Sequence, residues 1–404
     1  MTRSDESFRL PLRIVIAPQA FKGSLDATHV ASSIARGVRE VFVNAQLTVL
    51  PVADGGEGTV QALVRATGGR TVTTRVMGPL ERPVNATWGI LGGGQTGVIE
   101  MAAASGLPLI RRNERDAFRT TSYGTGELIR HALDYGVRHL IIGIGGSATN
   151  DGGAGMAQAM GARFLDSEGQ SIRLGGGGLR YLDRIDVSGL DPRLQGLIVD
   201  VACDVNNPLT GPMGATYIYG PQKGADSRMV EELDSYLQRY AEIVKRDLGR
   251  DVCTVPGAGA AGGLGAGLLA FTNAVLRRGV DIVFQALKVE EVVASSDLVI
   301  TGEGKIDRQD IYGKAPIAIA QIAQRFGVPC IAISGSTGRD YHVVYQFGLD
   351  ALIGTVNRPM SMDRAVAESG RLISEAAMRA CRLLCVGMRM GTPVGPNGEG
   401  SAIT

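Results

Sequence analysis

The sequence repeats one local pattern, in which a short run of β-branched residues is followed by a glycine-rich break and an amphipathic helix. The first example has a predicted strand over 13–17, a break over 18–23 and a predicted helix from about Leu25 to Val38, with Ser24 as its expected N-cap. Alternating strands and helices form parallel sheets with helices on their faces, and ligands bind beyond the carboxyl ends of such strands. The pattern therefore predicts an α/β fold whose site lies among the glycine-rich breaks.

Later examples extend this pattern over most of the chain. Three further strands are predicted over 139–144, 297–301 and 329–334, with breaks over 145–153 and 302–310 and helices from Ala154 and over about 315–326. The chain has 404 residues, whereas domains typically hold roughly 100–200, so two domains are expected. The tail over 391–404 is rich in glycine and polar residues and is expected to be disordered.

Charge, hydropathy and cysteine content exclude several classes of function. Lys and Arg total 41 against 40 for Asp and Glu, and no basic tract stands out, so neither a nucleic-acid nor a membrane partner is predicted. The longest apolar segment, over 264–276, is shorter than the roughly 20 residues that a membrane span needs. Five scattered cysteines form no CxxC pair, and the N-terminal residues lack a secretory pattern. A cytoplasmic protein with reduced thiols is expected.

The break over 145–153 is the strongest candidate for an anion site. Its sequence, GGSATNDGG, combines glycines with the polar side chains of Ser147, Thr149, Asn150 and Asp151. Freed backbone N–H groups, hydroxyls and the start of the next helix would together hold a phosphate. An ordinary glycine-rich turn between a strand and a helix is the alternative. No G-x-x-x-x-G-K-[ST] motif occurs, so a P-loop is excluded as the phosphate cradle.

Several carboxylates follow predicted strands or stand in glycine-rich turns. Asp204 ends an apolar run, Glu303 and Asp307 come just past another, and Asp54 stands in the turn PVADGGEG. A carboxylate at the carboxyl end of a strand suits Mg²⁺ binding or general-base catalysis. A solvated loop carboxylate is the alternative for each, and capping of the following helix is the alternative for Asp54.

Lysines in the breaks are candidate partners for phosphate or for a substrate carboxylate. Lys22 lies between the first strand and its helix, and Lys223 and Lys314 are weaker candidates of the same kind. The histidines sit in helix or strand patterns without evident partners and are expected to be surface or packing residues. They are His29, His131, His139 and His342.

One motif points to a different chemistry. Residues 257–262 fit G-x-G-x-x-G, precede a predicted helix and are followed by Asp281, which is the outline of a dinucleotide-binding fingerprint. An NAD-dependent hydroxy-acid dehydrogenase is therefore one alternative function. The stretch before the motif is short, polar and interrupted by Pro256. A close-packed helix start is the competing interpretation.

Long strings in this chain resemble those of the bacterial type-1 glycerate kinases, in the same order from about Arg13 to Met388. They include IVIAPQAFKGSL, PVADGGEGTV, IEMAAASGLPL, IIGIGGSATNDGGAGMAQAMGARF, VACDVNNPLTGPMGA, GPQKGA, PGAGAAGGLGAGLLAF and LVITGEGKID. The resemblance implies ATP-dependent phosphorylation of D-glycerate, usually at the 2-hydroxyl, which gives 2-phosphoglycerate. A kinase that forms 3-phosphoglycerate and a non-catalytic anion sensor remain alternatives.

The resemblance also implies an α/β protein with a discontinuous domain that contains a parallel sheet and a second domain inserted into it. We place these at 1–92 plus 290–390 and at 93–289. ATP and Mg²⁺ are the implied cofactors, and a homodimer is a candidate assembly. Gln19-Ala20 departs from the family, which commonly has Asp-Ser there, and Gln can bind neither a proton nor Mg²⁺ as a carboxylate does.

The residue patterns and the resemblance together lead to an expected role for each candidate. Asp204 would orient the glycerate hydroxyl, and Lys22, the second catalytic candidate, would hold the substrate or the transferring phosphate. Metal ligands would come from Asp54, Glu303 and Asp307. The substrate and the phosphate would be bound by Ser147, Thr149, Asn150, Asp151, Lys223 and Lys314.

Overall fold

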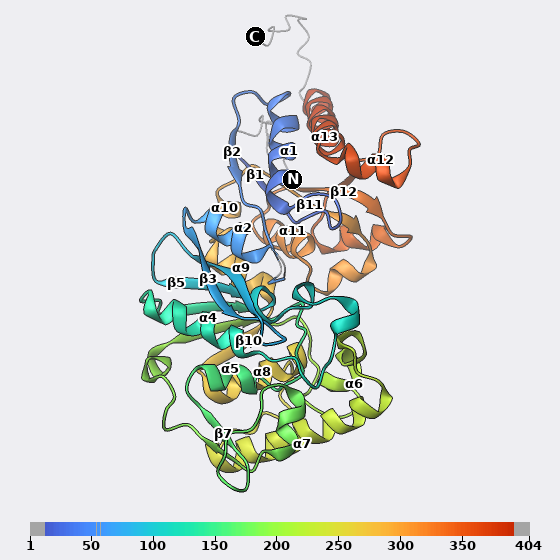
Figure 1. Cartoon of the computed structure of the whole chain (residues 1–404). Coiled ribbons are helices and arrows are strands. Elements are labelled where there is room, and N and C mark those ends of the chain that lie inside the picture. The colour runs from blue at the N-terminus through green and yellow to red at the C-terminus, as the bar shows by residue number, and fades with distance from the viewer. Residues whose placement is uncertain (1–12, 54, 57, 392–404) are drawn as a thin grey trace, which may run out of the picture. The chain divides into compact units, whose positions relative to one another are not determined.

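The computed structural model of the protein describes residues 13–53, 55–56 and 58–391. It divides the chain into two compact units (Figure 1), a first unit formed by Met1–Val52 with Lys288–Thr404 and a second unit from Ala53 to Leu287. The predicted α/β class, with one discontinuous unit and a second inserted into it, is confirmed. The chain enters the second unit after Val52, whereas the sequence analysis placed this passage near residue 92.

Residues 53–92 belong to the second unit because their strands complete its sheet. Strand β3 (Arg70–Met77) pairs antiparallel with β4 (Pro83–Ile90), and β4 pairs antiparallel with β5 (Thr96–Glu100). An antiparallel ribbon at the edge of a sheet lacks the strand–break–helix signal, so the sequence pattern did not show to which domain it belongs. The chain returns to the first unit between Leu287 and Lys288.

The first unit contains a five-stranded parallel sheet in the order β13-β12-β11-β1-β2. Its strands are β1 (Arg13–Pro18), β2 (Gln46–Val49), β11 (Leu298–Ile306), β12 (Cys330–Thr337) and β13 (Ala351–Gly354). Its helices are α1 (Ala27–Arg39), α10 (Val289–Ala294), α11 (Ala315–Arg325), α12 (Met362–Ala367), α13 (Ser369–Gly391) and the 3₁₀ helices η6 (Arg308–Tyr312) and η7 (Tyr341–Phe347). Residues 392–404, most of the predicted disordered tail, lie outside the described residues.

Helices cover this sheet because its strands are apolar throughout. Helices α1 and α13 pack against each other and share a core with β1, β11 and β12 that includes Ile14 and Ile373, while α11 contacts β1, β11 and β12. The N-cap of α1 is Asp26, whose carboxylate accepts from the His29 N–H at 2.9 Å. The prediction of Ser24 was wrong because the chain first makes a tight turn from Phe21 to Leu25.

Strand β11 is longer than its apolar run indicated. The segment over 302–306, predicted as a loop, continues the strand and pairs with β12 through Glu303↔Ser334 and Lys305↔Ser336. Polar residues at the end of a strand carry no apolar signal, although the backbone ladder continues through them. Glu303 is therefore held on a strand rather than on a loop.

The second unit contains a six-stranded mixed sheet in the order β10-β9-β6-β5-β4-β3. Its four parallel strands are β5, β6 (His139–Gly143), β9 (Ile198–Ala202) and β10 (Ala274–Arg277), and β7 (Arg163–Leu165) pairs with β8 (Arg184–Asp186) in a small ribbon. Its helices are α2 (Thr59–Ala66), α3 (Ala102–Ser105), α4 (Tyr123–Asp134), α5 (Ala154–Ala159), α6 (Ala215–Tyr219), α7 (Ser227–Leu248), α8 (Ala260–Phe271) and α9 (Gly279–Ala286). Short 3₁₀ helices cover 107–109, 112–114, 176–181, 192–196 and 221–223.

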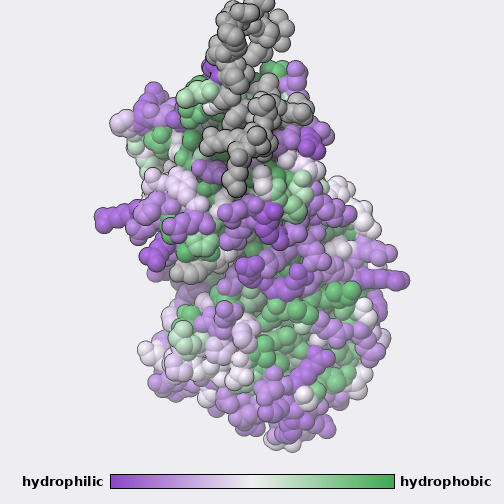
Figure 2. Space-filling model, turned by 180° about the vertical axis from the view of Figure 1, so that it is seen from behind, coloured by the Kyte–Doolittle hydropathy of each residue, from purple (hydrophilic) through white to green (hydrophobic). Residues whose placement is uncertain are grey.

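Two groups of helices cover the two faces of this sheet. Helix α2 contacts β3, β4 and β5, and α9 contacts β9 and α2, so these two helices share one face. The main core of the unit, centred on residues such as Leu140, Ile142 and Phe164, includes α4, α5, α7 and α8. Among the described residues, no helix combines the length and the apolar character of a membrane span. Figure 2 shows a mostly hydrophilic surface in which smaller hydrophobic areas are interspersed.

Candidate active site

The break over 145–153 follows the carboxyl end of β6 and is held from one side by the segment after β5. Leu107 N–H donates to the Gly146 carbonyl and Ala148 N–H donates to the Ser105 carbonyl, both at 2.9 Å. Gly146 has φ +73°, a conformation that favours glycine. Among the hydrogen bonds of the described residues, none uses the backbone N–H of Gly145, Gly146 or Ser147. Successive N–H groups of this kind suit an anion.

Asp151, which is part of this break, fixes its shape. Its side chain is fully buried, and its carboxylate accepts hydrogen bonds from Ser122 N–H at 2.8 Å, Ser122 Oγ at 2.9 Å and Gly153 N–H at 3.1 Å. Burial raises the pKa of Asp151, and the hydrogen bonds from Ser122 and Gly153 oppose this shift. Since Ser122 precedes the first residue of α4, Asp151 ties the start of that helix to the break.

Lys223 supports the same break from the opposite side. Its side chain is buried, and Nζ donates to the Thr149 carbonyl at 2.7 Å. Burial lowers the pKa of Lys223 to about 7, although the charge of Asp151 acts in the other direction. Asn150 is also fully buried and donates from Nδ2 to Thr216 Oγ1 at 2.9 Å.

These contacts change the roles expected for the polar residues of the break. Asp151 and Lys223 are buried and bonded to the protein, so the geometry favours a supporting role for them over direct contact with a ligand. Thr149 Oγ1 and Asn150 Oδ1 are also buried but have no hydrogen-bond partner among the described residues. Ser147 is largely buried and follows Gly145 and Gly146, which are the exposed part of the break.

Asp204 lies just past the carboxyl end of β9 with its side chain exposed. Its Oδ1 accepts a hydrogen bond from the Gly279 N–H, at the first residue of α9, at 2.9 Å. A carboxylate in this position is stabilised by the helix dipole. Asp204 therefore combines an exposed carboxylate with a fixed orientation.

Gly55 packs against the same edge of the sheet. A Cβ on Gly55 would lie 2.4 Å from the Ala202 Cβ and 3.1 Å from the Gly279 Cα, and the φ of Gly55 is +86°. Only glycine fits such a close approach without displacing the backbone. Asp54, the candidate metal ligand in this turn, lies outside the described residues.

The first unit contains a separate group of charged residues at the carboxyl ends of β1 and β11. Glu303 and Asp310 are both buried, and Lys314 forms ion pairs with both carboxylates, its Nζ lying 4.0 Å from Glu303 Oε1. Burial raises the pKa of Glu303 to about 8, and the negative charge of Asp310 adds to this shift. Burial opposes the charge on Lys314, but its hydrogen bond to Asp310 and the charge of Glu303 outweigh burial and raise its pKa.

Asp307 has a different set of partners from the one expected of a metal ligand. Its Oδ2 lies 2.7 Å from Lys305 Nζ, and its Oδ1 accepts from the Gln309 N–H at the start of η6. The hydrogen bond from Lys305 holds the pKa of Asp307 below its ordinary value. Asp310, which the sequence analysis missed, completes this capping arrangement by accepting from the Asp307 N–H at 2.5 Å. The spacing Asp-x-x-Asp after a strand was the available signal.

Lys22 lies close to this group on the exposed loop that follows β1. A Cβ on Gly304 would lie 3.4 Å from the Lys22 backbone N. The charge of Lys22 also lowers the pKa of Glu303, although this effect is smaller than those of burial, Asp310 and Lys314. Gln19 is buried, and its backbone N–H donates to the Gly302 carbonyl at 2.8 Å. Among the described residues, no group of three or more His, Cys, Asp or Glu side chains could hold a metal ion.

The G-x-G-x-x-G motif serves packing. Residues 249–256, which lead directly into it, form no strand, and Ala261, Gly262 and Gly263 have non-helical backbone angles. A Cβ on Gly262 would lie 1.9 Å from the Thr149 carbonyl oxygen, and the Gly262 carbonyl accepts from the Gly152 N–H at 3.0 Å. The motif therefore supports the break over 145–153, and the dinucleotide-binding interpretation was wrong.

Comparisons with known proteins agree with this arrangement. Residues 14–385 match the Glycerate kinase family. The chain is 52% identical to "Glycerate 2-kinase" of Escherichia coli (strain K12) over 378 residues, which cover 94% of this chain and 99% of that protein. It is 52% identical to "Glycerate kinase" of Bacillus subtilis (strain 168) over 366 residues, covering 91% and 96%.

A solved structure extends this likeness to three dimensions. A crystal structure whose description names glycerate kinase 2 from Salmonella typhimurium LT2 has a TM-score of 0.87 and 51% sequence identity. The match covers 94% of this chain and 99% of that one. The family match spans nearly the whole chain and includes the break over 145–153, Asp204 and Glu303. This chain therefore belongs to the glycerate kinase family.

Proposed function

We propose that this protein transfers the γ-phosphoryl group of ATP to the 2-hydroxyl of D-glycerate, which gives 2-phosphoglycerate and ADP. The observation that carries the proposal is 52% identity to "Glycerate 2-kinase" of E. coli over 99% of that protein's length. In the reaction the glycerate O2 bonds to the γ-phosphorus, the bond to the bridging oxygen breaks, and the hydroxyl proton leaves.

In the second unit, Asp204 is the group suited to receive the hydroxyl proton. It is exposed, lies at the end of a parallel strand, and its orientation is fixed by the Gly279 N–H. A general base must lie within hydrogen-bond reach of the proton that it accepts and keep its orientation as the bond forms.

The backbone N–H groups of Gly145, Gly146 and Ser147, which no hydrogen bond of the described residues uses, would bind an anionic oxygen of the substrate or of the transferred phosphoryl group. The buried residues behind them would hold the backbone in place, since Asp151 and Lys223 fix both sides of the break. Donors that are fixed before the reaction need no reorganisation as charge develops on the phosphoryl oxygens.

In the first unit, Glu303 and Asp310 would hold Mg²⁺. Both are buried residues whose carboxylates can supply oxygen ligands. Both also form ion pairs with the Lys314 ammonium group. Paired carboxylates next to substrate phosphates are a usual setting for Mg²⁺, which neutralises phosphate charge when it is bound. Lys22, exposed and close to Glu303, is the side chain that we assign to phosphate.

The proposed activity is tested by supplying D-glycerate and MgATP to the purified protein and coupling product formation to enolase. Because enolase consumes 2-phosphoglycerate directly, the coupled signal should appear without added phosphoglycerate mutase. A signal that requires the mutase would show phosphorylation at the 3-hydroxyl and contradict the regiochemistry. Absence of glycerate-dependent ADP release would contradict the kinase activity itself.

The cellular setting is a smaller proposal. All five cysteines are free thiols, of which Cys330 and Cys381 are buried. Free thiols throughout a chain are typical of a reducing compartment. We therefore assign the protein to the cytoplasm, and cell fractionation that recovered it elsewhere would contradict this assignment.

A further inference from the structure

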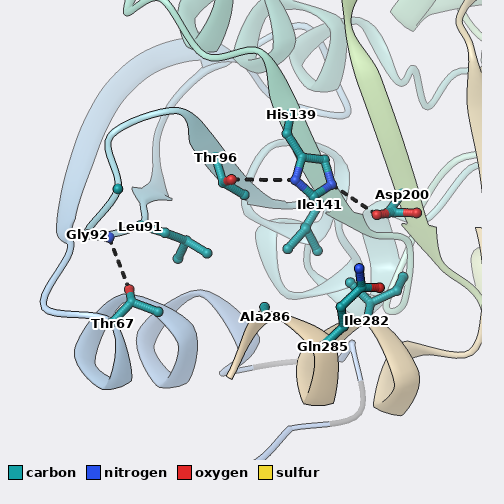
Figure 3. Close-up of a pocket in the computed structure, with 11 residues that line it drawn as sticks. Thr67, Leu91, Gly92, Thr96, His139, Ile141, Asp200, Ile282, Gln285 and Ala286 are labelled. Carbon is teal, nitrogen blue, oxygen red and sulfur yellow. Dashed lines mark hydrogen bonds and ion pairs between the residues drawn. The ribbon is translucent and has the colours of Figure 1, made fainter. Parts of the chain in front are cut away.

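The second unit contains a cavity that the proposed reaction does not use. It lies on the face of the sheet covered by α2 and α9, has a volume of about 300 Å³ and is shown in Figure 3. Thr96 and His139, the first residues of β5 and β6, lie on its wall. The break over 145–153 follows the opposite end of β6, roughly 13 Å away at about 3.3 Å per residue. We call this cavity the amino-edge pocket.

A chain of polar side chains crosses the wall of the amino-edge pocket. His139 Nε2 lies 2.9 Å from Asp200 Oδ2 and its Nδ1 lies 3.4 Å from Thr96 Oγ1, as Figure 3 shows. Asp200 Oδ1 accepts from Arg277 Nη1 at 3.2 Å, and Arg277 Nη2 donates to Gln285 Oε1 at 2.9 Å. These residues come from five different elements of the unit, namely β5, β6, β9, β10 and α9. The histidine that the sequence analysis assigned to surface or packing is thus part of a network with a carboxylate.

The hydrogen bonds within the pocket wall leave mainly hydrogen-bond donors available to a ligand. Both Asp200 oxygens and the Gln285 carbonyl oxygen are occupied, whereas the Gln285 amide group retains its N–H donors. Thr67 Oγ1 also has partners, because it donates to the Leu63 carbonyl at 2.8 Å and accepts from the Gly92 N–H at 3.2 Å. A ligand that matches this wall must therefore supply acceptors.

Charge and shape narrow the class of ligand. The charges of Asp200 and Arg277 cancel, so these two side chains give the wall no net charge that would repel an anion. The remaining wall is apolar and is formed by Leu91, Ile141, Ile282 and Ala286. A volume near 300 Å³ holds about ten waters at roughly 30 Å³ each, or a ligand with about ten non-hydrogen atoms. A short apolar body with one carboxylate fits these conditions.

The pocket is also joined to the proposed catalytic edge. Helix α9 begins at Gly279, whose N–H is bound by Asp204, and it reaches the pocket with Ile282, Gln285 and Ala286. Helix α2 likewise starts after the turn over 53–58 and ends beside Thr67 on the pocket wall. A ligand that moves α9 would therefore move the group that orients Asp204.

We propose that the amino-edge pocket is a second binding site of this protein, which takes a small organic acid and acts on catalysis through α9. The binding half of this proposal, that the pocket takes a small organic acid, is independent of the proposed function. The catalytic half, that the bound acid acts on catalysis through α9, rests on the proposed function. The two halves are tested by separate measurements, so that the failure of one is distinguishable from the failure of the other.

Benzoate is the probe for the binding half, and benzamide is its neutral control of the same shape. The protein has four histidines, so ¹³C labelling of the imidazole ring gives four signals, which are assigned by single His→Gln substitutions. In a titration at constant pH, benzoate should shift the His139 signal in a saturable way and leave those of His29, His131 and His342 in place. Benzamide should bind at least about fivefold more weakly.

The matched variant is Ala286→Leu, which places a larger side chain in the cavity while it keeps a good helix former on α9. It should abolish the benzoate-dependent shift of His139, and the unchanged positions of the other three signals would show that the fold is retained. A shift that survives in Ala286→Leu, equal binding of benzamide, or no saturable shift of His139 would each overturn the proposed site.

For the catalytic half, saturating benzoate should change kcat for glycerate phosphorylation at least twofold in the wild-type protein and leave Ala286→Leu unaffected. Saturable binding at His139 with unchanged kcat and KM would overturn the coupling through α9. An equal effect of benzoate in both proteins would show competition at the substrate site, which also contradicts the coupling. If neither protein phosphorylates glycerate, the proposed function fails, and the titration still decides the binding half.

Discussion

Asp204 Oδ1 accepts a hydrogen bond from the Gly279 N–H at 2.9 Å, so the proposed catalytic carboxylate also holds the first residue of α9. The two roles make different demands on the side chain. Capping requires only an acceptor oxygen, which an asparagine supplies, whereas accepting a proton from glycerate requires a carboxylate.

Asp204→Asn should therefore lower kcat by roughly 10²–10⁴ while the unfolding midpoint stays near that of the wild type. Asp204→Ala is the companion variant, and it should lose both activity and stability because α9 loses its cap. Steady-state kinetics and thermal unfolding of both variants make the comparison. If Asp204→Asn retained wild-type kcat, the carboxylate would be a cap alone.

Glu303 should make the stability of the protein fall as pH rises from about 4.5 to about 8. Burial raises its pKa from the ordinary value of 4.5 to about 8, so between these values the folded chain holds a proton that the unfolded chain has released. The resulting stabilisation is complete below about pH 4.5 and is lost as pH rises through 8. In urea unfolding at pH 6 and pH 8, Glu303→Gln should show a smaller decrease than the wild type, by about 1–3 kcal/mol.

An equal decrease in both proteins would assign the pH dependence to other groups. The control is Glu291→Gln, because Glu291 is exposed on α10 in the same unit and pairs with Lys288 only at 3.8 Å. It should follow the wild-type pH dependence.

Mg²⁺ should stabilise the first unit through the same carboxylates. A ligand that binds only the folded state raises its stability by an amount that grows with the ratio of its concentration to Kd, about 2.7 kcal/mol at a hundredfold ratio. At pH 8, which is close to the raised pKa of Glu303, MgCl₂ should raise the unfolding midpoint of the wild type and of Glu291→Gln. It should have little effect on Asp310→Asn or Glu303→Gln. A midpoint that rises equally in all four proteins would place the ion elsewhere.

Substitution of Lys223 and of Lys22 should distinguish a lysine that supports the fold from a lysine that binds a ligand. Lys223→Met removes the donor to the buried Thr149 carbonyl and should lower the unfolding free energy by roughly 1–3 kcal/mol. Lys22 is exposed, so Lys22→Met should leave the unfolding midpoint unchanged and raise KM or lower kcat at least tenfold. Loss of activity without loss of stability in Lys223→Met would show that Lys223 binds a ligand rather than supports the fold.

The lowered pKa of Lys223 adds a pH signature. Between about 7 and the ordinary value of 10.5 the unfolded chain holds a proton that the folded chain lacks, so folding stability should rise as pH increases through this window. Urea unfolding between pH 7 and pH 9 should show this rise in the wild type and a weaker one in Lys223→Met. A rise of the same size in both would contradict the assignment.

Local sequence determined much of this protein. Apolar runs and glycine breaks located β1, β6, α5 and α11 and their order, because hydrophobic periodicity and backbone freedom are properties of neighbouring residues. The same reasoning placed Asp204 just past a strand, whereas Glu303, expected past its strand, lies within β11. The long family strings, rather than any single motif, carried the glycerate kinase assignment.

Only the tertiary structure decided which polar residues face outward. Asp151 and Lys223 resemble candidate ligands in sequence, but partners distant in the chain, such as Ser122 for Asp151, hold them in the interior. The pairing of Glu303 with Asp310 and of His139 with Asp200 depends on packing between separate elements. Burial and side-chain contacts of this kind arise between segments far apart in the chain, so no local pattern specifies them.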